Sequence, residues 1–326
     1  MNVPDSNRVG PPTCWAISDG AAGNERQVLA LADAMGLAPR HLRLSLKQPW
    51  DALAPHLTAG ARAAMMDQGR RISAPWPDLA IGCGRRAALL TRCLRDWSDG
   101  RCFSVQILDP RIDSRHFDLV IAPRHDHVGG ANVLHSLGAL NPVSPSWLAQ
   151  GRQAWPDLSR FAGPRTAVLI GASTRAQHLD QGYFEALLAQ LGTFAGSFLV
   201  SASRRTPLPQ RQWLRRQFAE LPGCFWAGEE DGNNPYAAFL AWADRIVVTP
   251  DSVNMLSEAC ASGKPVHTLV QQPLRGKLAE FHTSLRQAGL LRDLNDTNAG
   301  IPVAPLAETA NLAADVLARW TDARGR

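Results

Sequence analysis

Short apolar runs alternate with segments of helical periodicity along almost the whole chain, and this rhythm constrains the fold more than any other feature. Residues 14–17 form an apolar run, a Gly-rich turn follows at 18–23, and apolar residues then recur at helical spacing from Val28 to Met35. Further apolar runs of strand length lie at 42–46, 79–82, 103–108 and 117–122. An alternation of strands and helices predicts a mostly parallel sheet that is buried on both faces.

The rhythm stops at residues 142–164, which are rich in Pro and have little periodicity, and then restarts. The second series of predicted strands covers 166–170, 197–201, 224–227, 245–249 and 266–269, and helices at 276–288 and 306–320 end the chain. A chain of 326 residues has the length of two average domains. We therefore predict an α/β protein with two Rossmann-like domains that face each other across a cleft. The predicted bounds are 1–150, 151–305, and a C-terminal helix at 306–326 that packs back on the first domain.

The composition narrows the class of protein. Hydrophobic residues make up 45% and charged residues 19%, so a large core can form and a disordered chain is excluded. The net charge of +5 is mild, with +4 in residues 1–160 and +1 in the remainder; the chain lacks the basic clustering expected of a nucleic-acid binder but allows an anionic ligand or an acidic membrane surface.

The cysteines and the N-terminus point to a reducing compartment. The six cysteines form no CxxC pair and have no His at zinc-like spacing, so we expect neither a disulfide framework nor a metal site. Residues 1–12 are polar and lack the basic start and apolar stretch of a secretory signal. No window reaches the ~18 apolar residues of a membrane span. We expect a cytoplasmic protein that is at most peripheral at the inner membrane.

The stretch from 243 to 266 carries the clearest functional signal. An apolar strand runs into a polar turn, and a helix begins at Asp251 or Ser252. A helix N-terminus presents unpaired N–H groups to an anion, and the Ser252 hydroxyl could add a hydrogen bond to a phosphate. Glu258, about two turns later, could bridge a ribose diol from an exposed position. The alternative interpretation is that Asp251 and Ser252 only cap the helix and that Glu258 is a solvated residue.

Residues 249–260, with Gly263-Lys264-Pro265-Val266 after them, resemble a bacterial and plant family named for mitochondrial fission. Three further segments, 15–27, 203–207 and 234–236, are similar to the same family, and together the matches span about residues 13–300. Bacterial members are described as glycosyltransferases of lipooligosaccharide outer-core assembly. The family resembles the GT-B group, whose nucleotide-sugar donor lies mainly on the C-terminal domain and which generally needs no catalytic metal. The resemblance thus implies a nucleotide-sugar donor, a saccharide or lipid-linked acceptor, and no cofactor.

The resemblance and the strand ends together give a set of expected donor-binding residues. These are Gly171, Ser173, Ser203, Arg204, Arg205, Asn234, Thr249, Asp251, Ser252, Ser257 and Glu258. Without a metal, the leaving diphosphate needs cations and helix N-termini, and an arginine pair supplies a rigid fork of donors. The alternative is a turn with two solvated arginines. Asp251 would repel a diphosphate that it faced, which leaves it to cap the helix or to orient Arg204.

The first strand end of the N-terminal domain is the expected acceptor side, formed by Ser18, Gly20, Gly23 and Asn24. The segment is not GxGxxG and has no well-placed acid about 20 residues later, so we exclude an NAD site. Asp19 is the first candidate for the general base that deprotonates an acceptor hydroxyl, although it could instead hold the turn through its own backbone. His125 and Asp126, after the strand at 117–122, are the second candidates. His125 and His127 form an HxH pair without further metal ligands nearby.

Two other functions remain open at this point. A non-hydrolysing sugar-nucleotide epimerase shares the GT-B architecture, and would change the donor sugar without an acceptor. A non-catalytic adaptor, the role of the plant relatives in fission, would need no transfer at all. The polar strand ends at Asp19, Arg204, Ser252 and Glu258 favour a working site over an inactive one.

Overall fold

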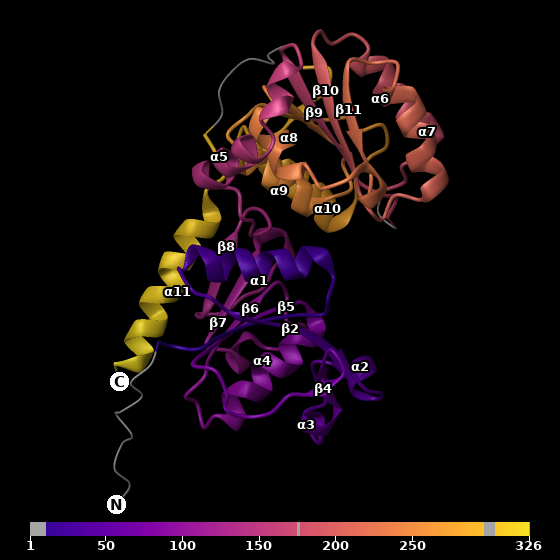
Figure 1. Cartoon of the computed structure of the whole chain (residues 1–326). Coiled ribbons are helices and arrows are strands. Elements are labelled where there is room, and N and C mark those ends of the chain that lie inside the picture. Colours follow the sequence, from indigo (N-terminus) through magenta and orange to yellow (C-terminus); the bar gives the residue numbers. More distant parts are fainter. Residues whose placement is uncertain (1–10, 175–176, 297–303, 326) are drawn as a thin grey trace, which may run out of the picture. The chain divides into compact units, whose positions relative to one another are not determined.

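The computed structural model describes residues 11–174, 177–296 and 304–325, and it divides the chain into two compact units. Unit 1 consists of Met1–Ser136 together with Thr309–Arg326, and unit 2 is Leu137–Glu308. Each unit has its own sheet with helices on it (Figure 1). The predicted α/β class with two Rossmann-like units is confirmed.

Unit 1 contains an eight-stranded sheet in the order β4-β3-β2-β1-β5-β6-β7-β8. Its strands are β1 Cys14–Ser18, β2 Arg40–Leu46, β3 Met65–Asp67, β4 Arg70–Arg71, β5 Leu79–Cys83, β6 Phe103–Ile107, β7 Leu119–Pro123 and β8 Val133–Ser136. Its helices are α1 Ala22–Ala34, α2 Trp50–Leu53, α3 Ala61–Ala64, α4 Arg85–Trp97 and α11 Glu308–Arg324. All neighbouring strands are parallel except at one edge, where β3 pairs antiparallel with β2 and with β4. The sequence did not predict β3, β4 or β8.

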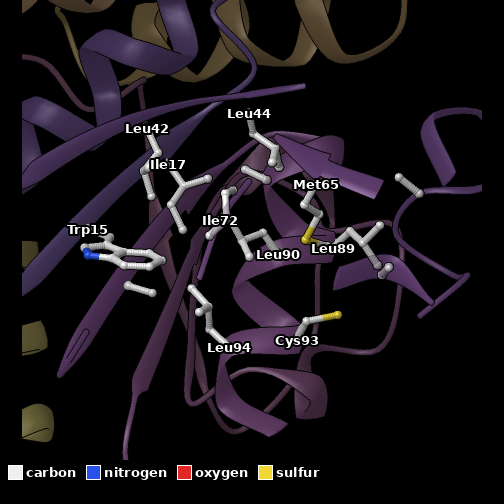
Figure 2. Close-up of a cluster of buried hydrophobic side chains, with 14 of the residues drawn as sticks. Trp15, Ile17, Leu42, Leu44, Met65, Ile72, Leu89, Leu90, Cys93 and Leu94 are labelled. Carbon is white, nitrogen blue, oxygen red and sulfur yellow. The ribbon is translucent and has the colours of Figure 1, made fainter. Parts of the chain in front are cut away.

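The core of unit 1 shows why these segments take these forms. Trp15 and Ile17 on β1 lie on the same face, because side chains on a strand alternate between its two faces. Figure 2 shows the apolar side chains of α4, among them Leu90 and Leu94, close to this face. Leu90 and Leu94 are four residues apart, so they share one stripe of the helix. Packing of the stripe against the strands fixes the carboxyl end of β1, where the candidate acceptor loop begins.

Unit 2 contains a six-stranded, fully parallel sheet in the order β11-β10-β9-β12-β13-β14. Its strands are β9 Arg165–Ile170, β10 Ser197–Ala202, β11 Gly223–Trp226, β12 Arg245–Val248, β13 Val266–Thr268 and β14 Arg292–Asp293. Its helices are α5 Pro145–Ala154, α6 Gln181–Leu191, α7 Leu208–Phe218, α8 Tyr236–Trp242, α9 Val253–Ala261 and α10 Gly276–Gln287. Along β9, Ala167 and Leu169 enter one hydrophobic cluster while Val168 and Ile170 enter another, so this strand is buried on both faces.

The structure places the boundary between the units at Ser136/Leu137, whereas the sequence predicted it near residue 150. The Pro-rich stretch taken for a linker contains helix α5, which Ser144 caps by accepting the Trp147 N–H and which begins with Pro145. Trp147 and Leu148 pack against the core of unit 2. Proline at the first position of a helix costs no hydrogen bond, so it starts a helix as readily as it interrupts one.

The second point at which the chain passes between units is Glu308/Thr309. The Glu308 carboxylate accepts hydrogen bonds from the backbone N–H groups of Leu137 (2.6 Å) and Gly138 (3.0 Å). Both ends of unit 2 are therefore tied to each other within that unit. No helix in the described part of the chain is long and apolar enough to cross a bilayer.

Candidate functional site

The sheet of unit 2 reverses its strand order between β9 and β12. From β9 the chain goes by way of α6 to β10 on one side, and it later returns to place β12 on the other side. In parallel α/β sheets, ligands bind outside the carboxyl ends of the strands at this switch point. The segments that leave β9 and β12, at 171–174 and 249–252, are therefore the natural walls of a ligand site.

A chain of hydrogen bonds joins these two loops. The Gly171 N–H donates to Thr249 Oγ1 (2.8 Å), and the Thr249 hydroxyl donates to Asp251 Oδ1 (2.6 Å). The Ala172 N–H donates to the other carboxylate oxygen of Asp251 (3.0 Å). From the neighbouring loop, the Thr206 hydroxyl donates to the Gly171 carbonyl (2.6 Å). The loop after β9 is thus held from both sides.

Residue 171 must be glycine in this arrangement. A Cβ added at Gly171 would lie 2.1 Å from Asp251 Oδ2 and 2.3 Å from Oδ1, far inside van der Waals contact. The constraint comes from the close approach of the carboxylate and not from an unusual backbone dihedral. Gly171 was expected to allow a ligand to approach the backbone closely. In the structure the group that approaches it closely is the Asp251 carboxylate.

Asp251 is buried and faces the protein. Burial raises the pKa of its carboxyl group, while the hydrogen bonds from Thr249 and Ala172 and the charge of Arg205 act in the opposite direction. Neither role expected for Asp251 describes this geometry, because Ser252 provides the helix cap and the carboxylate binds the loop after β9. Its carboxylate oxygens accept hydrogen bonds from Ala172 and Thr249 inside the protein.

Helix α9 begins at this switch point. The Ser252 Oγ accepts the Met255 N–H (3.3 Å), which makes Ser252 the N-cap. The first N–H groups of a helix have no acceptor within the helix, and its dipole leaves partial positive charge there. The structure thus has a helix N-terminus beside the Asp251 network, and anion binding there stays a prediction.

Two residues on α9 differ from the expectation. The Ser257 hydroxyl donates to the Val253 carbonyl (2.8 Å) and accepts the Ala139 N–H (2.9 Å), so it connects parts of the fold and does not face a ligand. Glu258 was expected on an exposed helix position, but only 2% of its surface is exposed. Its Oε2 accepts a hydrogen bond from the Tyr236 hydroxyl at 2.5 Å. A buried carboxylate with a hydroxyl donor contributes to folding as well as to any binding.

The loop after β10 places the arginine pair near the same edge. Arg204 and Arg205 are exposed, and Ser203 Oγ accepts the Arg205 N–H (3.2 Å). The Ser203 N–H donates to the Ile170 carbonyl (2.7 Å), which fixes this loop to the end of β9. The structure thus places the arginine loop beside the Gly171 loop.

The remaining candidates in unit 2 serve as turn and loop residues. Ser173 Oγ accepts the Leu179 N–H (2.9 Å) and so shapes the loop before α6. Asn234 is exposed, and its side-chain oxygen accepts the Tyr236 N–H (3.0 Å) at the start of α8. Asn234 therefore positions Tyr236, which in turn contacts Glu258.

Unit 1 has its own switch point between β1 and β5, and the candidate acceptor loop lies there. Asp19 Oδ1 accepts the Ala21 N–H (3.1 Å) and the Asn24 side-chain amide (3.0 Å), as in the alternative that Asp19 shapes the turn. Both of these hydrogen bonds within the described loop go to Oδ1 and not to Oδ2. Cys83 donates to Asn24 Oδ1 (3.5 Å), and burial raises its pKa well above the usual thiol value. Cys83 is therefore not a candidate nucleophile.

The other residues of this loop are structural to different degrees. Ser18 is fully buried, its hydroxyl lies 3.3 Å from His41 Nε2 and accepts the Gly20 N–H, and it is not presented to a ligand. Gly20 has φ +81°, and a Cβ added there would meet no atom within 4 Å, so the turn requires glycine for its backbone alone. Gly23 is the second residue of helix α1.

His125 and Asp126 lie in a short 3-10 turn directly after β7. His125 is buried and Asp126 is half-buried. In the described ranges, no group of three or more His, Cys, Asp or Glu side chains is placed to hold a metal ion. The HxH pair thus lacks a third described ligand.

Three residues of the site in unit 2 were missed by the sequence analysis. Thr206 and Tyr236 stand inside the segments that carry the family resemblance, so that resemblance was the signal that could have found them. His282, on α10, has Nε2 2.9 Å from the Pro250 carbonyl and is buried. Burial lowers its pKa to about 4, so the neutral ring donates this hydrogen bond to the Thr249–Asp251 turn. No local pattern marked His282.

Two solved structures share the architecture of this chain. A UDP-glucosyltransferase from Polygonum tinctorium aligns with a TM-score of 0.52 and 11% identity over 97% of this chain and 94% of that one. The protein Os79 of O. sativa, in complex with UDP, aligns with a TM-score of 0.51 and 12% identity over 95% and 93% of the two chains. At such identities the likeness shows the fold, which is that of GT-B glycosyltransferases.

Sequence comparison identifies the family. A protein of Arabidopsis thaliana named mitochondrial fission protein ELM1 is 31% identical over 286 residues, which cover 76% of this chain and 65% of that protein. The chain thus spans slightly less than two thirds of this relative. An uncharacterized protein of Rickettsia prowazekii, RP120, is 27% identical over 299 residues, covering 78% and 82%. The family described as mitochondrial fission ELM1 matches residues 22–320. The chain belongs to this mitochondrial fission ELM1 family.

Proposed function

We propose that this protein is a glycosyltransferase that binds a nucleotide-sugar donor on unit 2, at the switch point between β9 and β12, without a metal ion. The observation that carries the proposal is the buried Asp251 carboxylate, which joins the Gly171–Ala172 backbone to the N-terminal end of α9. This arrangement uses the Gly171 and Ala172 N–H groups within the protein and holds the N-terminus of α9 in a fixed position beside the arginine loop. Preorganised donors of this kind stabilise an anion that leaves in the transition state.

The donor diphosphate is assigned to the N-terminus of α9, where the Ser252 hydroxyl and backbone N–H groups gather, and to Arg204 and Arg205. Glu258 lies six residues after Ser252, which is about 9 Å along a helix. That separation suits contacts of one helix with a diphosphate and with the ribose of the same nucleotide. Tyr236 would orient the Glu258 carboxylate for the ribose, since it already donates to Oε2.

The acceptor is proposed to be a saccharide or a lipid-linked saccharide, as in lipooligosaccharide outer-core assembly, and the enzyme to work in the cytoplasm. Asp19 is the proposed general base, because its second carboxylate oxygen is not used by the turn. A positioned base contributes ~10²–10⁴-fold to rate. His125 and Asp126 are the proposed general bases if Asp19 does not serve as one. The proposal thus assigns donor binding to unit 2 and acceptor activation to unit 1.

The test is a calorimetric titration of the full chain with UDP, GDP, ADP and CDP in the presence of EDTA. One diphosphate should bind, and Arg204→Gln/Arg205→Gln should weaken it by roughly tenfold to a hundredfold, the range for losing a charged hydrogen bond. The matched control is Arg216→Gln, an exposed arginine on α7, which should bind as the parent does. Binding that disappears with EDTA and returns only with a divalent ion would contradict the metal-free site.

A second candidate is a non-catalytic role in fission, and the name of the Arabidopsis relative favours it. The two functions differ in turnover. Release of the nucleoside diphosphate from the matching nucleotide sugar, with acceptor or slowly with water, supports the transferase. A changed sugar on an intact donor would indicate an epimerase. Binding of no nucleotide by the folded chain would favour the adaptor.

A further inference from the structure

Positive charge gathers at one edge of unit 1, which is one of several basic stretches in the chain. Residues 40–76, from the start of β2 through α2, α3, β3 and β4, contain six Arg or Lys and two Asp, a net charge of +4, while the whole chain carries +5. Figure 1 shows α2, α3 and β4 together in one part of this unit. We call residues 40–76 the basic edge. The rest of residues 1–160 has twelve basic and twelve acidic residues, so the basic edge accounts for the excess positive charge of that half.

Every exposed acidic or basic side chain in the basic edge, apart from the histidines, is positive. These side chains are Arg40, Arg43, Lys47, Arg62, Arg70 and Arg71. The two acids, Asp51 and Asp67, are half-buried and form ion pairs with Arg86 and Arg40. Arg43 also pairs with Glu25 on α1 (2.7 Å), so the positive charge of this edge comes mainly from Lys47, Arg62, Arg70 and Arg71.

The basic edge also presents an apolar side chain on a firm support. Leu53 is 50% exposed, and the only comparable large apolar side chain in the described chain is Leu208, at 53%. Arg85 Nη1 donates to the carbonyls of Asp51 (2.7 Å) and Ala54 (3.0 Å), on either side of Leu53. Arg86 binds both carboxylate oxygens of Asp51, at 2.5 and 3.0 Å. The backbone on both sides of Leu53 is thus fixed by hydrogen bonds from α4.

We propose that the basic edge docks on an anionic phospholipid surface, with Arg70 and Arg71 among the lipid phosphates and Leu53 in the interfacial layer. Charge complementarity carries the choice of partner, because basic residues near an anionic membrane are attracted to it and an adjacent apolar side chain adds insertion. One exposed leucine is ordinary on a protein surface. An apolar side chain beside positive ones favours lipid over nucleic acid, and Leu208, which follows the exposed Arg204 and Arg205, is the comparison site in the test. The inference does not depend on sugar transfer.

A simpler explanation exists for part of the pattern. Arg70 and Arg71 form the short edge strand β4, and charged residues on an edge strand prevent sheets from pairing edge to edge. That explanation covers neither Lys47 and Arg62, which lie outside β4, nor the exposed Leu53. It predicts aggregation of neutralised variants without any effect of lipid, so the two explanations have different outcomes.

The experiment is co-sedimentation of the full chain with vesicles of phosphatidylglycerol and phosphatidylcholine in equal parts, against phosphatidylcholine alone. Binding is expected only to the anionic vesicles and should fall with added salt. Arg70→Gln/Arg71→Gln should lower partitioning roughly 30-fold, from about 1 kcal/mol per basic residue and tenfold per 1.4 kcal/mol. Leu53→Ser should lower it roughly tenfold, since half of a leucine is already buried.

The matched controls lie in unit 2. Leu208→Ser removes the other exposed leucine, and Arg216→Gln/Arg275→Gln removes two exposed arginines, and both variants should partition as the parent does. Urea unfolding checks that each variant folds. Equal binding to both vesicle types, or loss of binding in the controls as well, would overturn the proposal. So would capture by duplex DNA that loses affinity in Arg70→Gln/Arg71→Gln while vesicles do not bind.

Discussion

Asp251→Ala and Asp251→Asn distinguish a carboxylate that holds a loop from one that contacts a ligand. In the structure this side chain accepts from the Ala172 N–H and the Thr249 hydroxyl inside the protein. The alanine variant leaves both donors buried without their acceptor. The asparagine variant keeps a carbonyl oxygen for Ala172, and its NH₂ group can donate to Thr249 Oγ1, whose own hydrogen then turns away.

The expected magnitudes follow from these contacts. Each hydrogen bond to a charged acceptor contributes about 1.5–3 kcal/mol. Removing the carboxylate also ends the cost of burying it, so Asp251→Ala should lower the free energy of unfolding by roughly 2–4 kcal/mol. Asp251→Asn should lower it by only about 1 kcal/mol, because both contacts have a neutral replacement.

Urea unfolding followed by tryptophan fluorescence measures the stabilities, and UDP, GDP, ADP and CDP titrations measure the site. Asp251→Asn should bind the preferred diphosphate almost as the parent does, while Asp251→Ala should bind it weakly because its loop is released. Two results would refute the reasoning. One is an Asp251→Ala variant of parental stability. The other is an Asp251→Asn variant that folds normally but has lost its nucleotide, which would mean that the charge itself meets the ligand.

Three further predictions concern single side chains. Tyr236→Phe should lower the free energy of unfolding by about 1.5–3 kcal/mol, because it removes the hydroxyl donor of the buried Glu258, and urea titration checks this. Between pH 6.5 and 4 the unfolded chain should bind a proton at His282 that the folded chain excludes. As the pH is lowered over this range, the free energy of unfolding should therefore decrease by roughly 3 kcal/mol because of this residue. His282→Gln, which can still donate to Pro250, should flatten that part of the pH profile, and an unchanged profile would exclude His282 as its source. Asp19→Asn should remove ~10²–10⁴-fold of transferase turnover and leave the affinity for the donor within about twofold, and unaltered turnover would pass the role of base to another residue.

The alternation of strands and helices was predictable because strands buried on both faces are almost continuously apolar. The runs at 79–82 and 166–170 correspond to β5 and β9, and each end agrees to within one residue. The antiparallel pair β3 and β4 was not predictable, because strands of three and two residues at a sheet edge have no apolar run. Helix α5 was missed because Pro145 was interpreted as a break, although Ser144 before it is an N-cap.

The candidate site was predictable in its place but less so in the direction of its side chains. Strand ends and the helix start at Ser252 identified the switch point of unit 2. Helix α9 is buried on every side over its second half, from Leu256 to Ala261, so its periodicity does not show which residues face a ligand. Ser257 and Glu258 consequently looked alike in the sequence and differ in the fold. The contact between Asp251 and Gly171 joins residues 80 positions apart and left no local signal.

The most direct measurement of the central claim is hydrogen–deuterium exchange of the full chain in EDTA, with and without each of UDP, GDP, ADP and CDP. Bound nucleotide should slow exchange at backbone amides of 171–174, 203–206 and 249–255 in unit 2. The loop at 129–132 of unit 1 should exchange at the same rate with and without nucleotide. Protection at the three segments of unit 2 is the result that the account predicts. Protection confined to unit 1, or none with any of the four at saturating concentration, would contradict it.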